Sequence, residues 1–145
     1  MKKVTSKDGT TIAYDTFGNG PAVILVSAAF QTRSDQMMLK LASLLSSHFT
    51  VFNYDRRGRG DSGDTASYAV EREVEDIETL INEAGGSAFI FGMSSGGVLA
   101  LEAARKLAIA KLALYEPPFI VDNTRPPLPE DYLRQLKELT TSDQE

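Results

Sequence analysis

The sequence contains no cysteine and a single histidine among its 145 residues. Without cysteine the chain can form neither a disulfide framework nor a thiolate metal site, and a thiol nucleophile is excluded. The sequence also has no cluster of histidine and cysteine of the kind that binds metal ions. We therefore expect no metal and no organic cofactor.

Long apolar runs and clustered basic residues are also absent. No apolar stretch is long enough to cross a bilayer, and Lys2 and Lys3 are followed by polar residues rather than by the apolar core of a signal peptide. We expect a soluble, cytoplasmic protein with no membrane partner. The net charge of −5, and the lack of a basic cluster beyond residues 56–59, argue against a nucleic-acid partner.

The composition is that of one globular domain. A hydrophobic fraction of 42% and a charged fraction of 24% allow a real core and do not match a disordered chain. There are no internal repeats, and no linker separates two cores.

Strand patterns dominate the first half of the chain. Residues 2–6 and 10–17 alternate apolar with polar, and Asp8 and Gly9 between them form a strong turn signal, so an antiparallel hairpin is predicted. Continuous apolar runs, which are typical of parallel strands buried on both faces, occur at 22–26, 50–54, 87–91 and 111–115.

Helical periodicity separates these strands. It predicts helices over 37–45, 69–84, 98–106 and 130–139. Ser34 or Asp35 is the expected N-cap of the first helix, and we interpret Met37 and Met38 as core filling. The acidic face of the second helix is expected to be solvated. Together the patterns predict an α/β fold, a mostly parallel sheet with helices on both faces.

A Gly-x-Ser-x-Gly pentapeptide, residues 92–96, joins one predicted strand to the following helix. In that context it predicts a nucleophile elbow, a sharp turn that exposes the Ser94 hydroxyl. Gly92 and Gly96 lack side chains that would clash where strand and helix cross, and the Ser95 amide at the helix N-terminus can face a developing oxyanion. The alternative is a glycine-rich turn with an incidental serine.

With a second motif, the chain resembles the α/β-hydrolases, in particular the compact esterases, lactonases and cofactor-free peroxidases. Residues 55–62 match the Asp-x-x-Gly-x-Gly-x-Ser element of that family, and residues 92–96 match its elbow. The resemblance implies that Ser94 is the nucleophile and that the amides of Ser95 and Ala29 form the oxyanion hole. Ser27 and Ala28 stand where the family has His-Gly.

The resemblance also implies roles for the charged loop after residue 54. Asp55 and Ser62 are expected to shape the loop rather than to take part in chemistry. The arginines at 56, 57 and 59 either contact a substrate carboxylate or are solvated, and we favour solvation.

A catalytic triad is incomplete in these residues. Ser94 needs a histidine to accept its proton and a carboxylate to orient that histidine. The one histidine, His48, precedes a predicted strand, whereas Ser94 follows one, so the two are expected at opposite sheet edges. Glu116, after the last predicted strand, is a weak candidate for the acid.

The family resemblance implies that the acid and the histidine follow later strands. We therefore expect residues 1–116 to be the N-terminal part of the hydrolase core, truncated before the last strands, and residues 117–145 to begin a lid or cap. The strand at 111–115 would then be an open edge beside a bare sheet face, which favours self-association.

Two functions remain open. The first is a serine hydrolase of a small ester, lactone or related acyl substrate, inactive as these 145 residues alone. The second is a non-catalytic ligand-binding or interaction module on a hydrolase-like scaffold. Serine at position 94 argues against dehalogenase and epoxide-hydrolase chemistry, which usually needs a carboxylate there. The substrate, and hydrolysis as opposed to perhydrolysis, stay undetermined.

Overall fold

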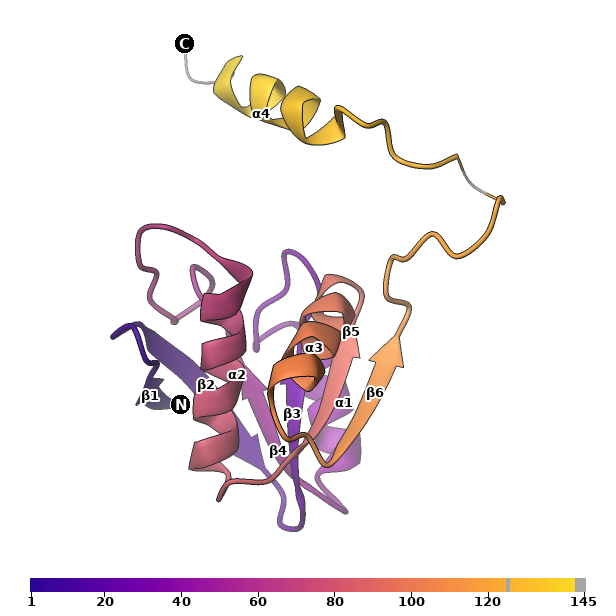
Figure 1. Ribbon diagram of the computed structural model, residues 1–145. Helices are drawn as coiled ribbons and strands as arrows, with labels where there is room; N and C mark the ends of the chain where they lie inside the picture. Colours follow the sequence, from indigo (N-terminus) through magenta and orange to yellow (C-terminus); the bar gives the residue numbers. More distant parts are fainter. Residues whose placement is uncertain (125, 143–145) are drawn as a thin grey trace.

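The computed structural model of the protein describes residues 1–124 and 126–142. A six-stranded sheet with the order β1-β2-β4-β3-β5-β6 forms its centre (Figure 1). The strands are β1 (Lys2–Thr5), β2 (Thr11–Phe17), β3 (Ala22–Val26), β4 (Thr50–Tyr54), β5 (Phe89–Met93) and β6 (Lys111–Tyr115). The helices are α1 (Gln36–Leu45), α2 (Val70–Glu83), α3 (Ser95–Lys106) and α4 (Tyr132–Ser142).

The first two strands form the predicted hairpin. β1 pairs with β2 antiparallel, and Gly9 in the turn has a φ of 89°, a left-handed conformation that favours glycine. β2 then pairs antiparallel with β4, so the hairpin joins one side of the parallel strands. The expected N-terminal antiparallel element is confirmed.

The four continuous apolar runs form the parallel part of the sheet. β3 lies between β4 and β5, and β6 pairs with β5. The strand before the pentapeptide begins at Phe89 and ends at Met93, two residues later at each end than the predicted 87–91. β5 therefore runs directly into Ser94.

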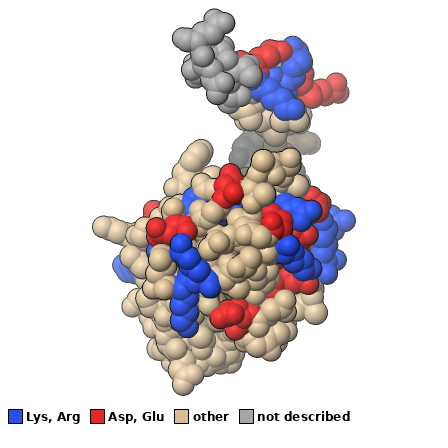
Figure 2. Space-filling view, turned by 90° about the vertical axis from the view of Figure 1, so that its left-hand side faces the viewer, with Lys and Arg blue, Asp and Glu red and all other residues tan. Residues whose placement is uncertain are grey.

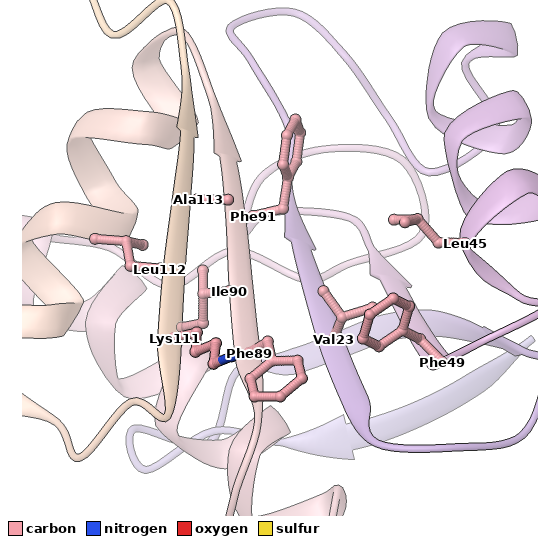
Figure 3. Close-up of a pocket in the computed structure, with 9 residues that line it drawn as sticks. All are labelled: Val23, Leu45, Phe49, Phe89, Ile90, Phe91, Lys111, Leu112 and Ala113. Atoms are coloured by element: carbon pink, nitrogen blue, oxygen red, sulfur yellow. The ribbon is translucent and has the colours of Figure 1, made fainter.

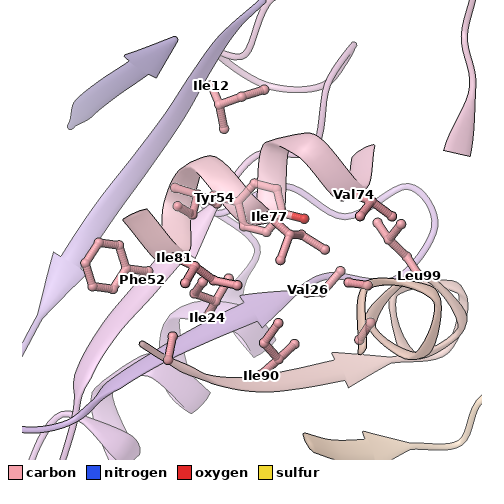
Figure 4. Packing of buried hydrophobic residues seen from close by; sticks show 14 of the residues in the cluster. Ile12, Ile24, Val26, Phe52, Tyr54, Val74, Ile77, Ile81, Ile90 and Leu99 are labelled. Atoms are coloured by element: carbon pink, nitrogen blue, oxygen red, sulfur yellow. The ribbon is translucent and has the colours of Figure 1, made fainter. Parts of the chain in front are cut away.

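Helices cover both faces of the sheet, as predicted. On one face, Ile24, Val26 and Ile90 of the sheet meet Ile77 of α2 and Leu99 of α3 (Figure 4).

On the other face, Val23, Leu25 and Val51 pack against Met38 and Ala42 of α1. Asp35 is the N-cap of α1, because its side chain accepts a hydrogen bond from the Met37 amide. Core filling is confirmed for Met38 but wrong for Met37, whose side chain points outward and is 55% exposed.

The surface carries mixed charge. On the side of β1 and α2, basic and acidic side chains lie interspersed (Figure 2). Among the described residues, no helix is long and apolar enough to span a bilayer. Beyond β6 the chain leaves the sheet, and α4 lies apart from it (Figure 1).

One part of the sheet near β6 is not covered by a helix. A hollow of about 350 Å³ opens there (Figure 3), with an apolar lining apart from one lysine: Val23, Leu45, Phe49, Phe89, Ile90, Phe91, Lys111, Leu112 and Ala113. Within residues 1–124 and 126–142, β6 has β5 as its only neighbour. The expected open edge and bare face are therefore present.

We propose that the 145-residue chain self-associates through this apolar face, because exposed apolar surface beside an unpaired strand favours association. Light scattering should give an average mass above that of a monomer. Ala113→Lys places a charge in the hollow and should lower that mass, whereas Ala66→Lys, at an exposed position in the loop before α2, should not. A monomeric wild-type protein would contradict the proposal.

Candidate active site

Ser94 occupies the sharp turn between β5 and α3. Its backbone angles, φ 50° and ψ −121°, are strained for a residue with a side chain. Hydrogen bonds hold this conformation. The Ser94 amide donates to the Tyr115 carbonyl at 2.9 Å, and the Ser94 carbonyl accepts from the Gly97 amide at 2.8 Å. The half-buried Ser94 side chain therefore sits at the carboxyl edge of the parallel strands.

The glycines of the pentapeptide permit a close crossing of strand and helix. A Cβ on Gly92 would lie 2.6 Å from the Gly96 carbonyl oxygen. A Cβ on Gly96 would come closer than 3.0 Å to the carbonyl oxygens of Val26 and Ser27. The start of α3 therefore lies against the end of β3, where the loop that contains Ala29 begins.

Two backbone amides near this crossing have no acceptor within the described part of the chain: those of Ala29 and Ser95. Ser95 is the first residue of α3, where helix geometry leaves the amide without an intrahelical partner. The neighbouring Ala28 amide, by contrast, donates to Oε1 of Gln31 at 3.0 Å. Free amides on both sides of the crossing suit the binding of an anionic oxygen.

The charged loop after β4 is built around the buried carboxylate of Asp55. This carboxylate pairs with the Arg33 guanidinium and accepts from the backbone amides of Arg33 at 2.7 Å and Asp61 at 2.9 Å. Ser62 Oγ donates to the Asp55 carbonyl at 2.7 Å and accepts from the Ala13 amide at 2.9 Å. The loop-shaping roles expected for Asp55 and Ser62 are confirmed.

Solvation of the neighbouring arginines was the wrong expectation. Arg56 is 6% exposed and makes a two-fold contact with Glu73, at 2.6 and 2.7 Å. Arg57 is equally buried and contacts Asp76 at 2.8 Å through each of two nitrogens. The acidic face of α2 is therefore solvated only in part, because Glu73 and Asp76 turn inward to neutralise these guanidinium groups.

These ion pairs set the charge state of the buried groups. Burial opposes ionisation of the Glu73 carboxyl, but the hydrogen bonds and charge of Arg56 outweigh it and lower the pKa of Glu73 below its ordinary value. Tyr68 adds a third hydrogen bond to Glu73 at 2.9 Å. Glu73 is thus held as a carboxylate at neutral pH.

Sequence reasoning missed the contacts that two arginines make with Ser95 and with the loop after β3. Arg56 Nη1 lies 3.4 Å from the Ser27 carbonyl oxygen and 3.3 Å from Ser95 Oγ. Arg59 Nη1 donates to the Ala28 carbonyl at 2.8 Å.

A signal for the buried pairs was present in the sequence. Glu73 and Asp76 stand four residues before Ile77 and Leu80, so they lie along the apolar stripe of α2 and must be buried with it. A buried carboxylate requires a cationic partner, and the adjacent arginines at 56 and 57 were the candidates.

The remaining candidates lie where the strand order predicts. His48 is exposed and lies just before β4, whose first residue pairs with the first residue of β3. It is therefore at the amino ends of these parallel strands, whereas Ser94 is at the carboxyl end of β5. Glu116 directly follows β6, at the same edge as Ser94. No cluster of three potential metal-ligating side chains exists among the residues that the structure describes.

Substitution of Gly96 tests the close crossing. We expect Gly96→Ala to lower the free energy of unfolding by roughly 1–3 kcal/mol or more, because the carbonyls of Val26 and Ser27 are backbone atoms that cannot move aside easily. Urea unfolding followed by circular dichroism measures this. Gly63→Ala is the control, since its Cβ would meet no atom closer than 3.6 Å. Equal stability of the two variants would contradict the packing.

Substitution of the Arg56–Glu73 pair tests the buried charges. Arg56→Met leaves Glu73 buried without its cation and should cost roughly 3–5 kcal/mol of stability, whereas Arg56→Met with Glu73→Leu should cost much less. Because the folded-state pKa of Glu73 is depressed, its stabilising contribution is present above the ordinary glutamate pKa of 4.5 and is lost as the pH falls through the lower folded value. Lowering the pH should therefore lower the free energy of unfolding of wild type more than that of the double variant. A difference between the two that does not change with pH would contradict the assignment.

Comparison with known proteins gives the same fold. Residues 15–143 match the family described as the alpha/beta hydrolase family. An alpha/beta hydrolase from Sphaerobacter thermophilus is 54% identical, with a TM-score of 0.89 over 97% of this chain and 55% of that chain. A thermophilic esterase from Thermogutta terrifontis is 28% identical, with a TM-score of 0.78 over 99% of this chain and 53% of that chain.

Two relatives match by sequence. An uncharacterized hydrolase of Bacillus subtilis, YraK, is 32% identical over 65% of this chain and 35% of its own length. A proline iminopeptidase of Pestalotiopsis fici, PfmaB, is 31% identical over 74% of this chain and 40% of its own length. The chain thus spans about half of these solved structures and less than half of these relatives. On the match of residues 15–143, the chain belongs to the alpha/beta hydrolase family.

Proposed function

We propose that Ser94 is the nucleophile of a serine hydrolase that acts on a small ester, lactone or related acyl substrate. The observation that carries this proposal is a serine held at φ 50° and ψ −121° between β5 and α3, beside two backbone amides without acceptors among the described residues. These features support the proposal of a nucleophile elbow next to an oxyanion hole.

In the proposed reaction, Ser94 Oγ attacks the substrate carbonyl carbon while a general base removes the hydroxyl proton. The carbonyl oxygen becomes an oxyanion, and the amides of Ser95 and Ala29 donate hydrogen bonds to it. The base then returns the proton to the leaving group. Water repeats the sequence on the acyl-enzyme and releases the acid product.

The base cannot be His48 in this structure, because that residue lies at the other edge of the sheet. We propose that the histidine and its orienting carboxylate come from residues outside these 145, in agreement with the half length of the solved relatives that this chain covers. Glu116 is the alternative for the acid within these residues, since it directly follows β6, at the carboxyl ends of the strands where Ser94 lies.

The relatives support an acyl substrate without selecting one. An esterase and a proline iminopeptidase, as those proteins are named, cleave ester and peptide bonds, and both reactions pass through an attack on a carbonyl. Serine in the turn supports the same class.

Residues 117–145 are proposed to begin a lid over this edge. The segment departs from the end of β6, at the Ser94 edge, and α4 lies beyond the sheet (Figure 1). Apolar side chains on α4 are exposed, among them Leu133 at 62% and Leu139 at 66%. An amphipathic helix of this kind can cover an apolar acyl group.

A second candidate function is a non-catalytic ligand-binding or interaction module. The position of the one histidine favours it, since a serine without a base is a poor nucleophile. The two functions differ in the reactivity of Ser94.

A fluorophosphonate probe distinguishes the two functions, because it labels an activated serine and leaves an unactivated one unmodified. We expect the protein from its natural reading frame to be labelled at Ser94 and the 145-residue chain alone to stay unlabelled. Ser94→Ala should abolish labelling, and His48→Ala, the control, should leave it unchanged. Absence of labelling in the natural protein would favour the binding module.

A further inference from the structure

Arg59 differs from the other arginines that the structure describes in having no carboxylate partner. Ion pairs join carboxylates to Arg33, Arg56, Arg57, Arg72, Arg105 and Arg134. Arg59 Nη1 instead donates to a backbone oxygen, the carbonyl of Ala28, at 2.8 Å. The side chain is also partly buried, and both this burial and the nearby positive charge of Arg56 lower the pKa of Arg59. The charge of Glu73 acts in the opposite direction, but among the described residues no carboxylate contacts Arg59 directly, and the one hydrogen bond of its side chain to protein is the contact with Ala28.

The carbonyl that Arg59 binds belongs to the same peptide unit as the Ala29 amide. A peptide unit is planar and trans, so its C=O and N–H point in opposite directions. A hydrogen bond that fixes the Ala28 oxygen therefore fixes the direction of the Ala29 N–H. The donor is charged, and a charge-assisted hydrogen bond to the carbonyl polarises the unit and strengthens its N–H as a donor.

The surrounding contacts leave this peptide unit few alternatives. The Ala28 amide is already held by Gln31 Oε1 at 3.0 Å, and Phe30, on the other side, has a left-handed φ of 61° with a fully exposed side chain. The Ala28 amide is thus bound, and the Ala28 carbonyl accepts from Arg59 at 2.8 Å and, at the longer distance of 3.5 Å, from the Gln31 amide. The Ala29 amide has no acceptor among the described residues.

We propose that Arg59 is a positioning residue that orients and polarises the Ala28–Ala29 peptide so that the Ala29 amide serves as an oxyanion donor. This inference rests on the proposed function, in which that amide and the Ser95 amide receive the oxyanion. Arg56 contacts the neighbouring residue of this loop, since its Nη1 lies 3.4 Å from the Ser27 carbonyl oxygen, and it also lies 3.3 Å from Ser95 Oγ.

The first test is spectroscopic and does not need catalysis. In Arg59→Met, which keeps the apolar stem, the carbonyl 13C signal of Ala28 and the amide 15N signal of Ala29 should move upfield, and Arg59→Lys should fall between this variant and wild type. Arg105→Met, an exposed arginine on α3, should leave both signals in place. The same spectra are recorded in a Ser94→Ala background, in which the signals report on the peptide without any catalysis by Ser94. Unchanged Ala28 and Ala29 signals in Arg59→Met would overturn the proposal.

The second test is kinetic, with p-nitrophenyl acetate and the protein from its natural reading frame. Loss of one oxyanion donor typically lowers kcat by about 100- to 1000-fold, so a misoriented donor should lower it by roughly 10- to 100-fold, with KM unchanged. Arg59→Lys should recover part of kcat, and Arg105→Met should match wild type. An unchanged kcat in Arg59→Met would overturn the proposal.

A substrate ligand would give a different pattern. If Arg59 bound a substrate carboxylate, Arg59→Met would raise KM for an anionic ester such as p-nitrophenyl hemisuccinate and leave kcat for p-nitrophenyl acetate unchanged, which would also overturn the proposal. Esterase activity that survives in Ser94→Ala would show instead that the proposed function is wrong. The catalytic role of Arg59 would then fall with it, while the Ala28 and Ala29 signals would still report whether Arg59 holds the peptide.

Discussion

Two buried ion pairs, Arg56–Glu73 and Arg57–Asp76, fix the loop after β4 against α2, and the surroundings of Ser94 depend on them. A buried guanidinium is tolerated only when its charge is paired and its hydrogen bonds are made. Glu73 takes two of the nitrogens of Arg56, and this leaves Nη1 aimed at Ser27 and Ser95. Charge pairing in the core thereby holds Arg56 against the Ser27 carbonyl and the Ser95 side chain.

The second constraint is the absence of side chains at Gly92 and Gly96. Strand β5 can feed α3 through a single strained residue only because the helix start may approach β3 to backbone contact. The strain at Ser94 is held by the bond from its amide to the Tyr115 carbonyl, so β6 contributes to the turn as well as to the sheet. The candidate site is therefore supported by β3, β5, β6 and α2 together.

Local pattern was sufficient to predict most of the fold. Apolar runs identified the parallel strands, Asp8 and Gly9 the hairpin, and the Gly-x-Ser-x-Gly spacing the turn at Ser94, because each of these depends on neighbours close in sequence. The buried arginines were mispredicted because their partners lie 17 and 19 residues away, and charge is normally placed on the surface. The bond from Arg59 to Ala28 spans 31 residues and leaves no periodic trace in the sequence.

The two outer strands of the sheet, β1 and β6, differ in how readily a further strand could pair with them. β1 has four residues and carries Lys2 and Lys3. Short, charged edge strands of this kind resist pairing with a further strand. β6 is mostly apolar and exposed, and it borders the hollow beside Phe89 and Phe91. Further strands, whether from this polypeptide or from another, thus have one favourable place to add, next to β6. Any strand that adds to the sheet beside β6 therefore also lies near Ser94, whose amide binds the last residue of β6.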